Sequence, residues 1–345
     1  MHRHKKIRFS RGIAGLMVMT VLLSACVGGH LSKNNSGEYR NGMVVSAHPS
    51  ASKVGLDILK KGGNAVDAAV AVQFALAVVY PEAGNLGGGG FMVYRSAGGE
   101  LATLDFREKA PGKASRDMYL DSEGKVITDK SLYGHLAAGV PGSVDGMVKA
   151  HEKFGKLSWA EVVQPALDLA RNGFPVTEDQ AEDYIIIQEG LKKFNPGKSY
   201  FIKDKWAKGD VWVQKDLART LELIRDKGRE GFYAGEVADH IEAEMAGGGG
   251  LISKEDLKNY QSQWREPLVG NYKEYKVITM PPTSSGGIAL LQLLNSVEDY
   301  PLKRWGHNSD STVQVMVEAE RRVYADRATH LGDPDFYKVP QKYLV

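Results

Sequence analysis

The sequence predicts a layered α/β fold with an internal sheet, and three observations favour it. Segments with helical periodicity alternate along the chain with short segments rich in β-branched and aromatic residues. Residues 65–79 are apolar nearly all round, which is typical of a buried helix. Residues 91–95 and 101–107 are strand-like and are separated by a glycine-containing linker that suits a β-hairpin. We also expect a helix-rich lobe over about residues 145–265.

The N-terminus has the pattern of an export signal. A basic run in the first 11 residues precedes the apolar stretch 13–25, which is too short to span a bilayer as a mature helix. The stretch ends in LSAC and resembles a bacterial lipobox, in which the signal is cleaved before Cys26 and the thiol is lipidated. We therefore expect an exported lipoprotein of the bacterial cell envelope, facing the periplasm or in the outer membrane. An ordinary secretory signal with a chance cysteine is the alternative.

Charge and cysteine content narrow the class of protein further. The chain has 44 Lys and Arg against 42 Asp and Glu, but residues 1–25 hold five of the basic residues and no acidic ones. The net charge of the mature chain is therefore about −3, and nothing in the sequence indicates nucleic-acid binding. Cys26 is the only cysteine, so no intrachain disulfide can form. We divide the chain into a signal peptide (1–25), a polar tether (26–42) and one domain (43–345).

The elements of this domain follow from periodicity and capping residues. Strands are expected at 43–47, 91–95, 101–107 and 276–280. Helices are expected at 51–61, 65–79, 159–172, around 217–224, and at 237–245, 254–259, 288–297 and 312–328. Capping boxes support two of them, through Asn64 with Asp67 and through Ser158 with Glu161.

Glycine-rich residues 84–90 invite comparison with a phosphate-binding loop. Such a loop follows a strand and opens a helix, whereas this one follows a helix and precedes a strand, and no Walker lysine follows it. We favour a tight turn in which bare backbone passes close to another strand. Exposed amides lining a substrate pocket are the functional alternative.

The sequence DFRE at 105–108 ends the predicted hairpin. Alternation places Ala102, Leu104 and Phe106 on one face of the strand, and Thr103, Asp105 and Arg107 on the other. An arginine beside acidic residues is usually part of a structural ion pair.

Other catalytic patterns are missing from the sequence. It contains no GxSxG elbow, no zinc-protease histidine spacing and no calcium loop, so we predict no metal and no cofactor. Ser284 and Ser285 fit helix caps better than nucleophiles, because no base is placed beside them. The carboxylates around Asp326 and Asp333 fit a helix end and a turn rather than an acid–base pair.

Six further segments, together with the 64–107 region, resemble the γ-glutamyltransferase (glutathione hydrolase) family in family order. They are GVPGSV (139–144), GFY (231–233), GLISKEDL (250–257), MPPTSSGG (280–287), YADR (324–327) and LGDPDF (331–336). The resemblance implies an N-terminal-nucleophile hydrolase fold, an αββα sandwich that is incomplete in this chain. It implies that Arg107 binds the α-carboxylate of the γ-glutamyl group, for which a planar guanidinium is well suited.

In this family the nucleophile is a threonine that becomes N-terminal when the precursor cleaves itself, and its own amine serves as the base. The resemblance places that threonine beyond Val345, at the start of a missing small subunit. Thr329 and His330 superficially resemble that start, but they lie in a segment that the family uses upstream of the cleavage site. We therefore expect this chain to be inactive by itself.

The resemblance implies an enzyme that transfers the γ-glutamyl group of glutathione or related amides to water, amino acids or peptides. Two alternatives stay open at this point. The chain could be a non-catalytic, surface-anchored binding protein of the same fold, or a cephalosporin-type acylase.

Overall fold

The computed structural model describes residues 41–195 and 199–345. The predicted signal peptide, the predicted lipidation site Cys26 and most of the predicted tether lie outside the described residues. Residues 44–345 form one compact unit, and the description below concerns this unit. No helix in the described ranges is both long enough and apolar enough to cross a bilayer.

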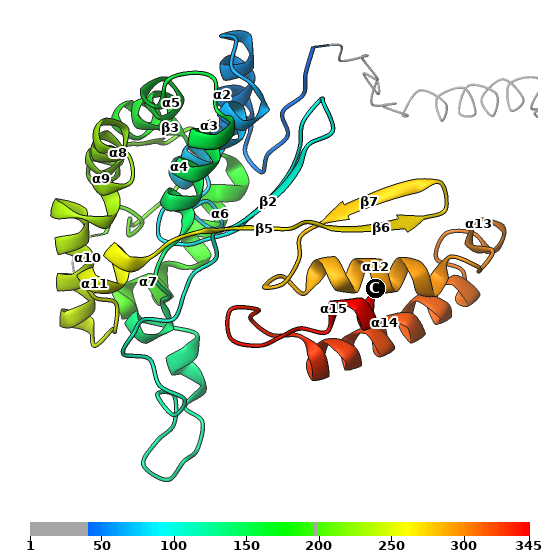
Figure 1. The fold of residues 1–345 in the computed structure, drawn as a ribbon. Coiled ribbons are helices and arrows are strands. Elements are labelled where there is room, and N and C mark those ends of the chain that lie inside the picture. Colours follow the sequence, from blue (N-terminus) through cyan, green and yellow to red (C-terminus); the bar gives the residue numbers. More distant parts are fainter. Residues whose placement is uncertain (1–40, 196–198) are drawn as a thin grey trace, which may run out of the picture. The chain divides into compact units, whose positions relative to one another are not determined.

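Helices dominate the described residues (Figure 1). In the first part of the chain they are α2 (Pro49–Lys60), α3 (Ala65–Val79), α4 (Ser143–Phe154), α5 (Trp159–Asn172), α6 (Glu178–Ile186), α7 (Gln188–Phe194) and α8 (Lys215–Lys227). The later helices are α9 (Glu230–Tyr233), α10 (Gly235–Gly248), α11 (Lys254–Asn259), α12 (Gly286–Val297), α13 (Leu302–Trp305), α14 (Asp310–His330) and α15 (Gln341–Leu344). Two short 3-10 turns are Thr128–Ser131 and His135–Ala137.

The strands form three small antiparallel sheets. They are β1 (Phe91–Arg95), β2 (Leu101–Asp105), β3 (Phe174–Pro175), β4 (Val211–Trp212), β5 (Gln263–Arg265), β6 (Leu268–Tyr272) and β7 (Tyr275–Thr279). One sheet has the order β1-β2-β5, and the other two are the pairs β3-β4 and β6-β7. The mixed α/β class is therefore confirmed, with more helix than strand. Among the described residues these strands do not build two stacked sheets.

The buried helix α3 forms because its start is capped and its sides are apolar. The Asn64 side chain accepts hydrogen bonds from the Val66 and Asp67 amides, and the Asp67 carboxylate accepts one from the Asn64 amide at 2.8 Å. Asp67 is fully buried and also accepts the Lys156 amide at 2.9 Å. The predicted capping box is confirmed, and it ties α3 to the turn that follows α4.

Helices α4 to α11 make up most of residues 143–259, as expected for a helix-rich lobe. Helix α5 packs against both α3 and α8, and its predicted capping box between Ser158 and Glu161 is present. Helix α11, expected at 254–259, begins after Ser253, whose hydroxyl accepts the Asp256 amide. These helices enclose one apolar core that includes Phe74, Leu167 and Ile224.

The strand predicted at residues 43–47 is wrong. These residues form no strand, because their polar groups are used in a turn that leads into α2. The Ser46 amide donates to Ser52 Oγ at 3.1 Å, and Ser46 Oγ donates to the His48 carbonyl at 3.0 Å. His48 then caps α2 by accepting the Ser50 amide. The apolar pattern of this segment favours a strand, but the local side-chain bonds of Ser46 compete with strand pairing.

The last part of the unit consists of the β6–β7 ribbon and helices α12 and α14. Helix α12 packs on α14 and on β6 (Figure 1). The turn after β7 leads directly into α12, while α14 ends at His330 and continues into the 331–340 loop. This turn and this loop both approach the end of β2, and together they form the candidate site.

Candidate functional site

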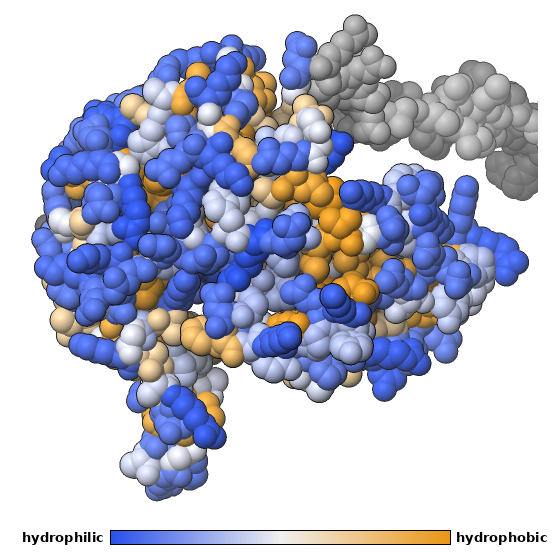
Figure 2. Space-filling model, viewed as in Figure 1, coloured by the Kyte–Doolittle hydropathy of each residue, from blue (hydrophilic) through white to orange (hydrophobic). Residues whose placement is uncertain are grey.

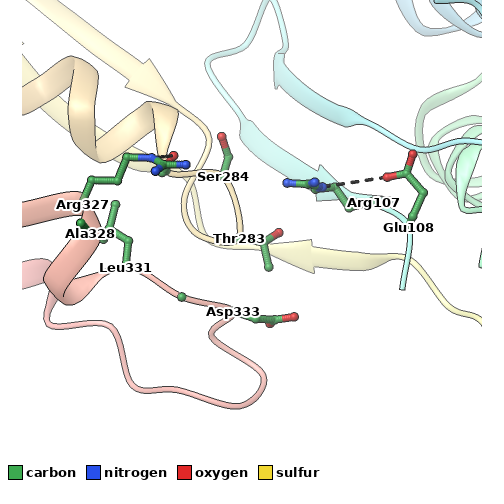
Figure 3. Close-up of a pocket in the computed structure, with 10 residues that line it drawn as sticks. Arg107, Glu108, Thr283, Ser284, Arg327, Ala328, Leu331 and Asp333 are labelled. Carbon is green, nitrogen blue, oxygen red and sulfur yellow. Dashed lines mark hydrogen bonds and ion pairs between the residues drawn. The ribbon is translucent and has the colours of Figure 1, made fainter. Parts of the chain in front are cut away.

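A cavity of about 550 Å³ opens beside the end of β2 (Figure 3). Its lining comes from three separate parts of the chain: the end of the β1–β2 hairpin, the turn between β7 and α12, and the end of α14 with its following loop. The lining residues are Arg107, Glu108, Thr283, Ser284, Ser285, Arg327, Ala328, Leu331, Gly332 and Asp333. Its size lies within the range typical of small-molecule sites.

The glycine loop holds the end of the hairpin in place by close backbone contact. A Cβ atom on Gly89 would lie 2.5 Å from the Phe106 carbonyl oxygen and 2.8 Å from Arg107 Cα. Gly90 continues the pairing, because Phe106 N donates to Gly90 O at 3.0 Å. The predicted tight turn against a neighbouring strand is therefore confirmed. The loop's glycines are not among the residues that line the cavity.

Asp105 joins three segments at the edge of the cavity. Its buried carboxylate accepts the Arg107 amide at 3.1 Å, Arg265 Nε at 2.7 Å and the Thr283 hydroxyl at 2.8 Å. Arg265 extends the network by donating to Asp335 at 3.0 Å. The hydrogen bond from Arg265 lowers the pKa of Asp335 below its usual 3.8, against the opposing effect of burial.

Arg107 lies two residues after β2, because the strand ends at Asp105 rather than at the predicted residue 107. Its side chain is 55% exposed and extends into the cavity (Figure 3). Its one carboxylate neighbour within the described residues is Glu108, with 3.9 Å between Nε and Oε2. Asp105, the expected structural partner, pairs instead with Arg265. The Arg107 guanidinium is thus held only loosely by internal acceptors.

Tyr260 holds the Arg107 main chain in place through a hydrogen bond. The Tyr260 hydroxyl donates to the Arg107 carbonyl at 2.7 Å, and its ring stacks on Tyr233 with 5.8 Å between centroids. Burial raises the pKa of Tyr260 above its usual 10, and the neighbouring Tyr233 and Asp145 add to the shift. The phenol therefore stays protonated and remains a donor across the physiological pH range.

The turn before α12 presents hydroxyl groups to the cavity. Ser284 Oγ accepts the Gly286 amide at 3.3 Å, which agrees with the predicted capping role. Ser285 occupies the N-cap position, but its side chain caps nothing and instead accepts Arg327 Nε at 2.9 Å. The cap prediction is therefore confirmed for Ser284 and wrong for Ser285. The Ser285 hydroxyl is thus the acceptor for Arg327 of α14.

The two acidic residues named from the sequence lie where the turn interpretation put them. Asp326 lies within the last turns of α14 and accepts Gln292 Nε2 at 2.9 Å. Asp333 accepts the Asp335 amide at 2.9 Å in the loop after α14, and it also lines the cavity. In the part of the chain that the structure describes, no cluster of three or more potential ligands could hold a metal ion.

Sequence reasoning missed three residues of this site. Thr283, Arg265 and Arg327 come from elements that are distant in sequence from Asp105 and Arg107; Arg265 is 160 residues from Asp105. Thr283 and Arg327 lie in the motifs at 280–287 and 324–327, which give no role for either residue, and Arg265 lies in none of the motifs. The weak signal was an arginine in a helix-ending segment next to a serine-rich turn.

Comparisons with known proteins agree with this architecture. Residues 51–345 match the family model described as Gamma-glutamyltranspeptidase. The glutathione hydrolase proenzyme of Escherichia coli (strain K12) is 50% identical over 308 residues, which are 88% of this chain and 53% of that protein. The chain therefore spans about half the length of the curated relatives it matches.

Solved structures show the same likeness. The γ-glutamyltranspeptidase of Helicobacter pylori superposes with a TM-score of 0.86 at 47% identity, over 88% of each chain. A cephalosporin acylase from Bacillus halodurans superposes with a TM-score of 0.76 at 30% identity, over 88% of this chain and 57% of that one. With a family model that spans nearly all of the described residues, this chain belongs to the gamma-glutamyltranspeptidase family.

Proposed function

We propose that this chain forms the large-subunit part of a γ-glutamyltransferase, or glutathione hydrolase. The enzyme would cleave γ-glutamyl amides such as glutathione and pass the γ-glutamyl group to water, an amino acid or a peptide. Arg107 would hold the α-carboxylate of the γ-glutamyl group. The observation that carries this proposal is the Arg107 side chain, which extends into a 550 Å³ cavity and has among the described residues only the long 3.9 Å contact with the Glu108 carboxylate.

The contrast with Arg265 supports this role for Arg107. Arg265 is 15% exposed and bonds both Asp105 and Asp335, so its charge is already balanced. Arg107 is more exposed, and its Glu108 contact is long for a hydrogen bond. A ligand carboxylate could therefore receive two parallel bonds from its guanidinium without displacing a structural ion pair.

We further propose that a small subunit supplies the nucleophile as an N-terminal threonine. The relatives extend well beyond the length that this chain matches, and they bear the description proenzyme. The same partner would complete an αββα sandwich around the β1-β2-β5 sheet. Figure 2 shows apolar side chains gathered in one area of an otherwise polar face. Val93 of β1, Val269 of β6 and Leu290 of α12 are each more than 40% exposed.

Two other functions compete with this proposal. A cephalosporin-type acylase shares the fold, and a binding protein without catalysis would share the cavity. The Arg107 side chain favours a substrate that carries a carboxylate close to the bond to be cleaved. An acylase would hydrolyse amide substrates at similar rates whether or not their acyl group carries the amino-acid carboxylate. A binding protein would hydrolyse no amide.

The decisive experiment is a two-by-two cycle on the enzyme assembled from this chain and its small subunit. The two enzymes are wild type and Arg107→Ala, and the two substrates are a γ-glutamyl anilide and its analogue without the α-carboxylate. Loss of a charge-assisted, bidentate contact should cost about 2–4 kcal/mol, or roughly 30- to 1,000-fold in kcat/KM. The analogue should be poor for wild type and hardly poorer for Arg107→Ala.

Arg107→Lys serves as the charge control. It keeps the positive charge but loses the planar fork, so it should recover only part of the lost activity. Equal losses for Arg107→Ala with both substrates would show that Arg107 is structural. Arg95→Ala is a matched control on the same hairpin, because Arg95 ends β1 and does not line the cavity.

We also propose that the protein is an exported lipoprotein anchored in the bacterial cell envelope through Cys26. The proposal rests on the basic run, the short apolar stretch and the LSAC sequence. Cys26→Ser should release the protein from the membrane fraction or block its processing. One acyl chain anchors a protein only marginally, so the expectation assumes the multiply acylated bacterial form. Unchanged membrane partitioning of a correctly exported Cys26→Ser protein would contradict it.

A further inference from the structure

The cavity beside β2 contains a second arginine, which neither the sequence nor the proposed role of Arg107 accounts for. Arg327 lies in the last turn of α14 and lines the same cavity as Arg107. Figure 3 shows the two labelled side chains extending toward the cavity from opposite sides. We propose that Arg327, with Ser284 and Ser285, forms a second anion subsite, which binds a carboxylate on the peptide portion beyond the scissile γ-glutamyl amide.

The contacts of Arg327 leave most of its donors available. Its Nε donates to Ser285 Oγ at 2.9 Å, and its guanidinium lies 5.9 Å from the Tyr324 ring centroid. Among the described residues, no carboxylate lies within ion-pair distance of it. A guanidinium has five N–H donors, so the single bond through Nε orients the group without using its two terminal nitrogens.

Other arginines of the chain behave differently. Arg229 donates to Asp145 and to main-chain carbonyls, and Arg219 forms ion pairs with Glu222 and Glu236. In these cases the charge is neutralised inside the protein. At the cavity, by contrast, the two arginines face a shared space that is large enough for more than the γ-glutamyl group.

The charges around the cavity match a peptide with two carboxylates and one amine. The lining contains Arg107 and Arg327 as cations, and Glu108 and Asp333 as anions. Glutathione-like donors carry an α-carboxylate and an amine at one end and a terminal carboxylate at the other. Resting on the proposed function, this inference assigns Arg327 the selection of leaving groups that carry a carboxylate.

Arg327 could instead have a purely structural role, which makes different predictions. A cation in the last turn of a helix interacts favourably with the helix dipole, and the bond to Ser285 ties α14 to the turn before α12. That role predicts a loss of stability and an equal loss of activity with every substrate. The subsite predicts a loss that depends on the leaving group.

The test compares γ-glutamyl-p-nitroanilide with its analogue that carries a carboxylate on the aromatic ring. The enzymes are the assembled wild type, Arg327→Gln, Arg327→Lys and the control Arg321→Gln, which removes an exposed charge from the same helix outside the cavity. Arg327→Gln should lower kcat/KM by roughly five- to tenfold for the carboxylated substrate, since an exposed ion pair is screened by solvent. It should leave the uncharged leaving group nearly unaffected.

Arg327→Lys should keep part of the preference, and Arg321→Gln should change neither rate. Equal losses for Arg327→Gln with both anilides would overturn the second subsite and leave the proposed function intact. Failure of the wild type to hydrolyse either anilide would overturn the proposed function itself, and this inference with it.

A binding measurement separates the two ideas without turnover. Calorimetric titration of the full chain would compare glutathione with its glycine ethyl ester, in which the terminal carboxylate is masked. The wild type should bind glutathione more tightly than the ester by about fivefold, and Arg327→Gln should bind both alike. Equal binding of the two ligands by the wild type would refute the second subsite. A preference for glutathione that is unchanged in Arg327→Gln would refute it as well.

Discussion

Two of the buried aspartates, Asp145 in the helix-rich lobe and Asp105 at the cavity, each pair with an arginine that is distant in sequence. Asp145, at the start of α4, accepts Arg229 Nε at 2.7 Å and the Ser262 amide at 2.7 Å. Asp105, at the end of β2, accepts Arg265 Nε at the same distance. Both carboxylates are almost inaccessible to solvent, so each needs these partners to offset the cost of burying a charge.

The two networks differ in what their arginines do next. Arg229 turns its remaining donors to Glu230 at 3.2 Å and to main-chain carbonyls, including that of Tyr260 at 2.6 Å, and none of these partners lines the cavity. Arg265 instead reaches Asp335 in the loop after α14, which belongs to the cavity region. The Asp105 network therefore holds the cavity's walls together, while Arg107 beside it stays available. An arginine whose N–H donors are all used inside the protein has a structural role, whereas one that keeps donors available can bind a ligand. Its position beside an acidic residue does not by itself separate the two cases.

We expect the largest effect from a substitution that removes the charge of Asp145. Asp145→Asn keeps the shape but removes the charge that balances Arg229, and its amide would face the Ser262 N–H. We expect a loss of about 2–4 kcal/mol in unfolding free energy, because the largely buried Arg229 loses its buried partner and keeps only the exposed Glu230 carboxylate. Urea denaturation monitored by tryptophan fluorescence would measure it.

Asp117→Asn is the matched control for this variant. Asp117 pairs with Arg116 at 3.9 Å, and both side chains are mostly exposed, so the substitution should change stability by less than about 0.5 kcal/mol. Similar losses for the two variants would mean that burial does not set the strength of the Asp145 network, and the comparison with Asp105 would lose its basis.

The sequence pointed to Asp105 and Arg107 at the cavity, but it indicated no long-range ion pair in either network. Alternation along β2 placed Thr103 and Asp105 on one face, although the strand ends before Arg107, and capping patterns located the starts of α3 and α5. The partner of Asp105 could not be found in this way, because Arg265 belongs to a strand 160 residues away and pairs through the sheet. Periodicity reports which face a residue occupies, whereas tertiary pairing decides which charge it meets.

A smaller effect should follow from cutting the link between the two networks. Tyr260 accepts Arg229 through its carbonyl and donates its hydroxyl to the Arg107 carbonyl. Tyr260→Phe keeps the stacked ring and removes only the hydroxyl, so stability should fall by about 1 kcal/mol. Because Arg107 loses a main-chain anchor, KM for a γ-glutamyl anilide should rise more than kcat falls.

Tyr233→Phe is the control for this step. The Tyr233 hydroxyl donates to the Pro141 carbonyl at 2.8 Å and not to Arg107, so its loss should reduce stability without raising KM. Steady-state kinetics and urea denaturation of both variants provide the two readouts. If both variants raise KM equally, Tyr260 has no specific part in positioning Arg107.

The smallest effect concerns Asp335, the outer end of the Asp105 network, and it should depend on pH. The Arg265 hydrogen bond lowers the pKa of Asp335 below its usual 3.8, so folding favours the ionised carboxylate. The resulting stabilisation is fully present above about pH 4 and is lost as the pH falls through the lowered pKa of the folded state. Asp335→Asn lacks it at every pH. Since the side chain is 39% exposed, wild type should exceed the variant by only a few tenths of a kcal/mol, roughly, at neutral pH.

Urea denaturation of the two proteins at neutral pH and at successive steps below pH 4 would follow this difference. Other carboxylates titrate in both proteins, so their contributions cancel in the comparison. The difference should shrink toward zero in acid, because the protonated carboxyl no longer balances Arg265. A difference that stays constant through this range would show that Asp335 acts through its neutral contacts. The Asp105 network would then end at Arg265, and the loop after α14 would owe its position in the cavity wall to packing rather than to charge.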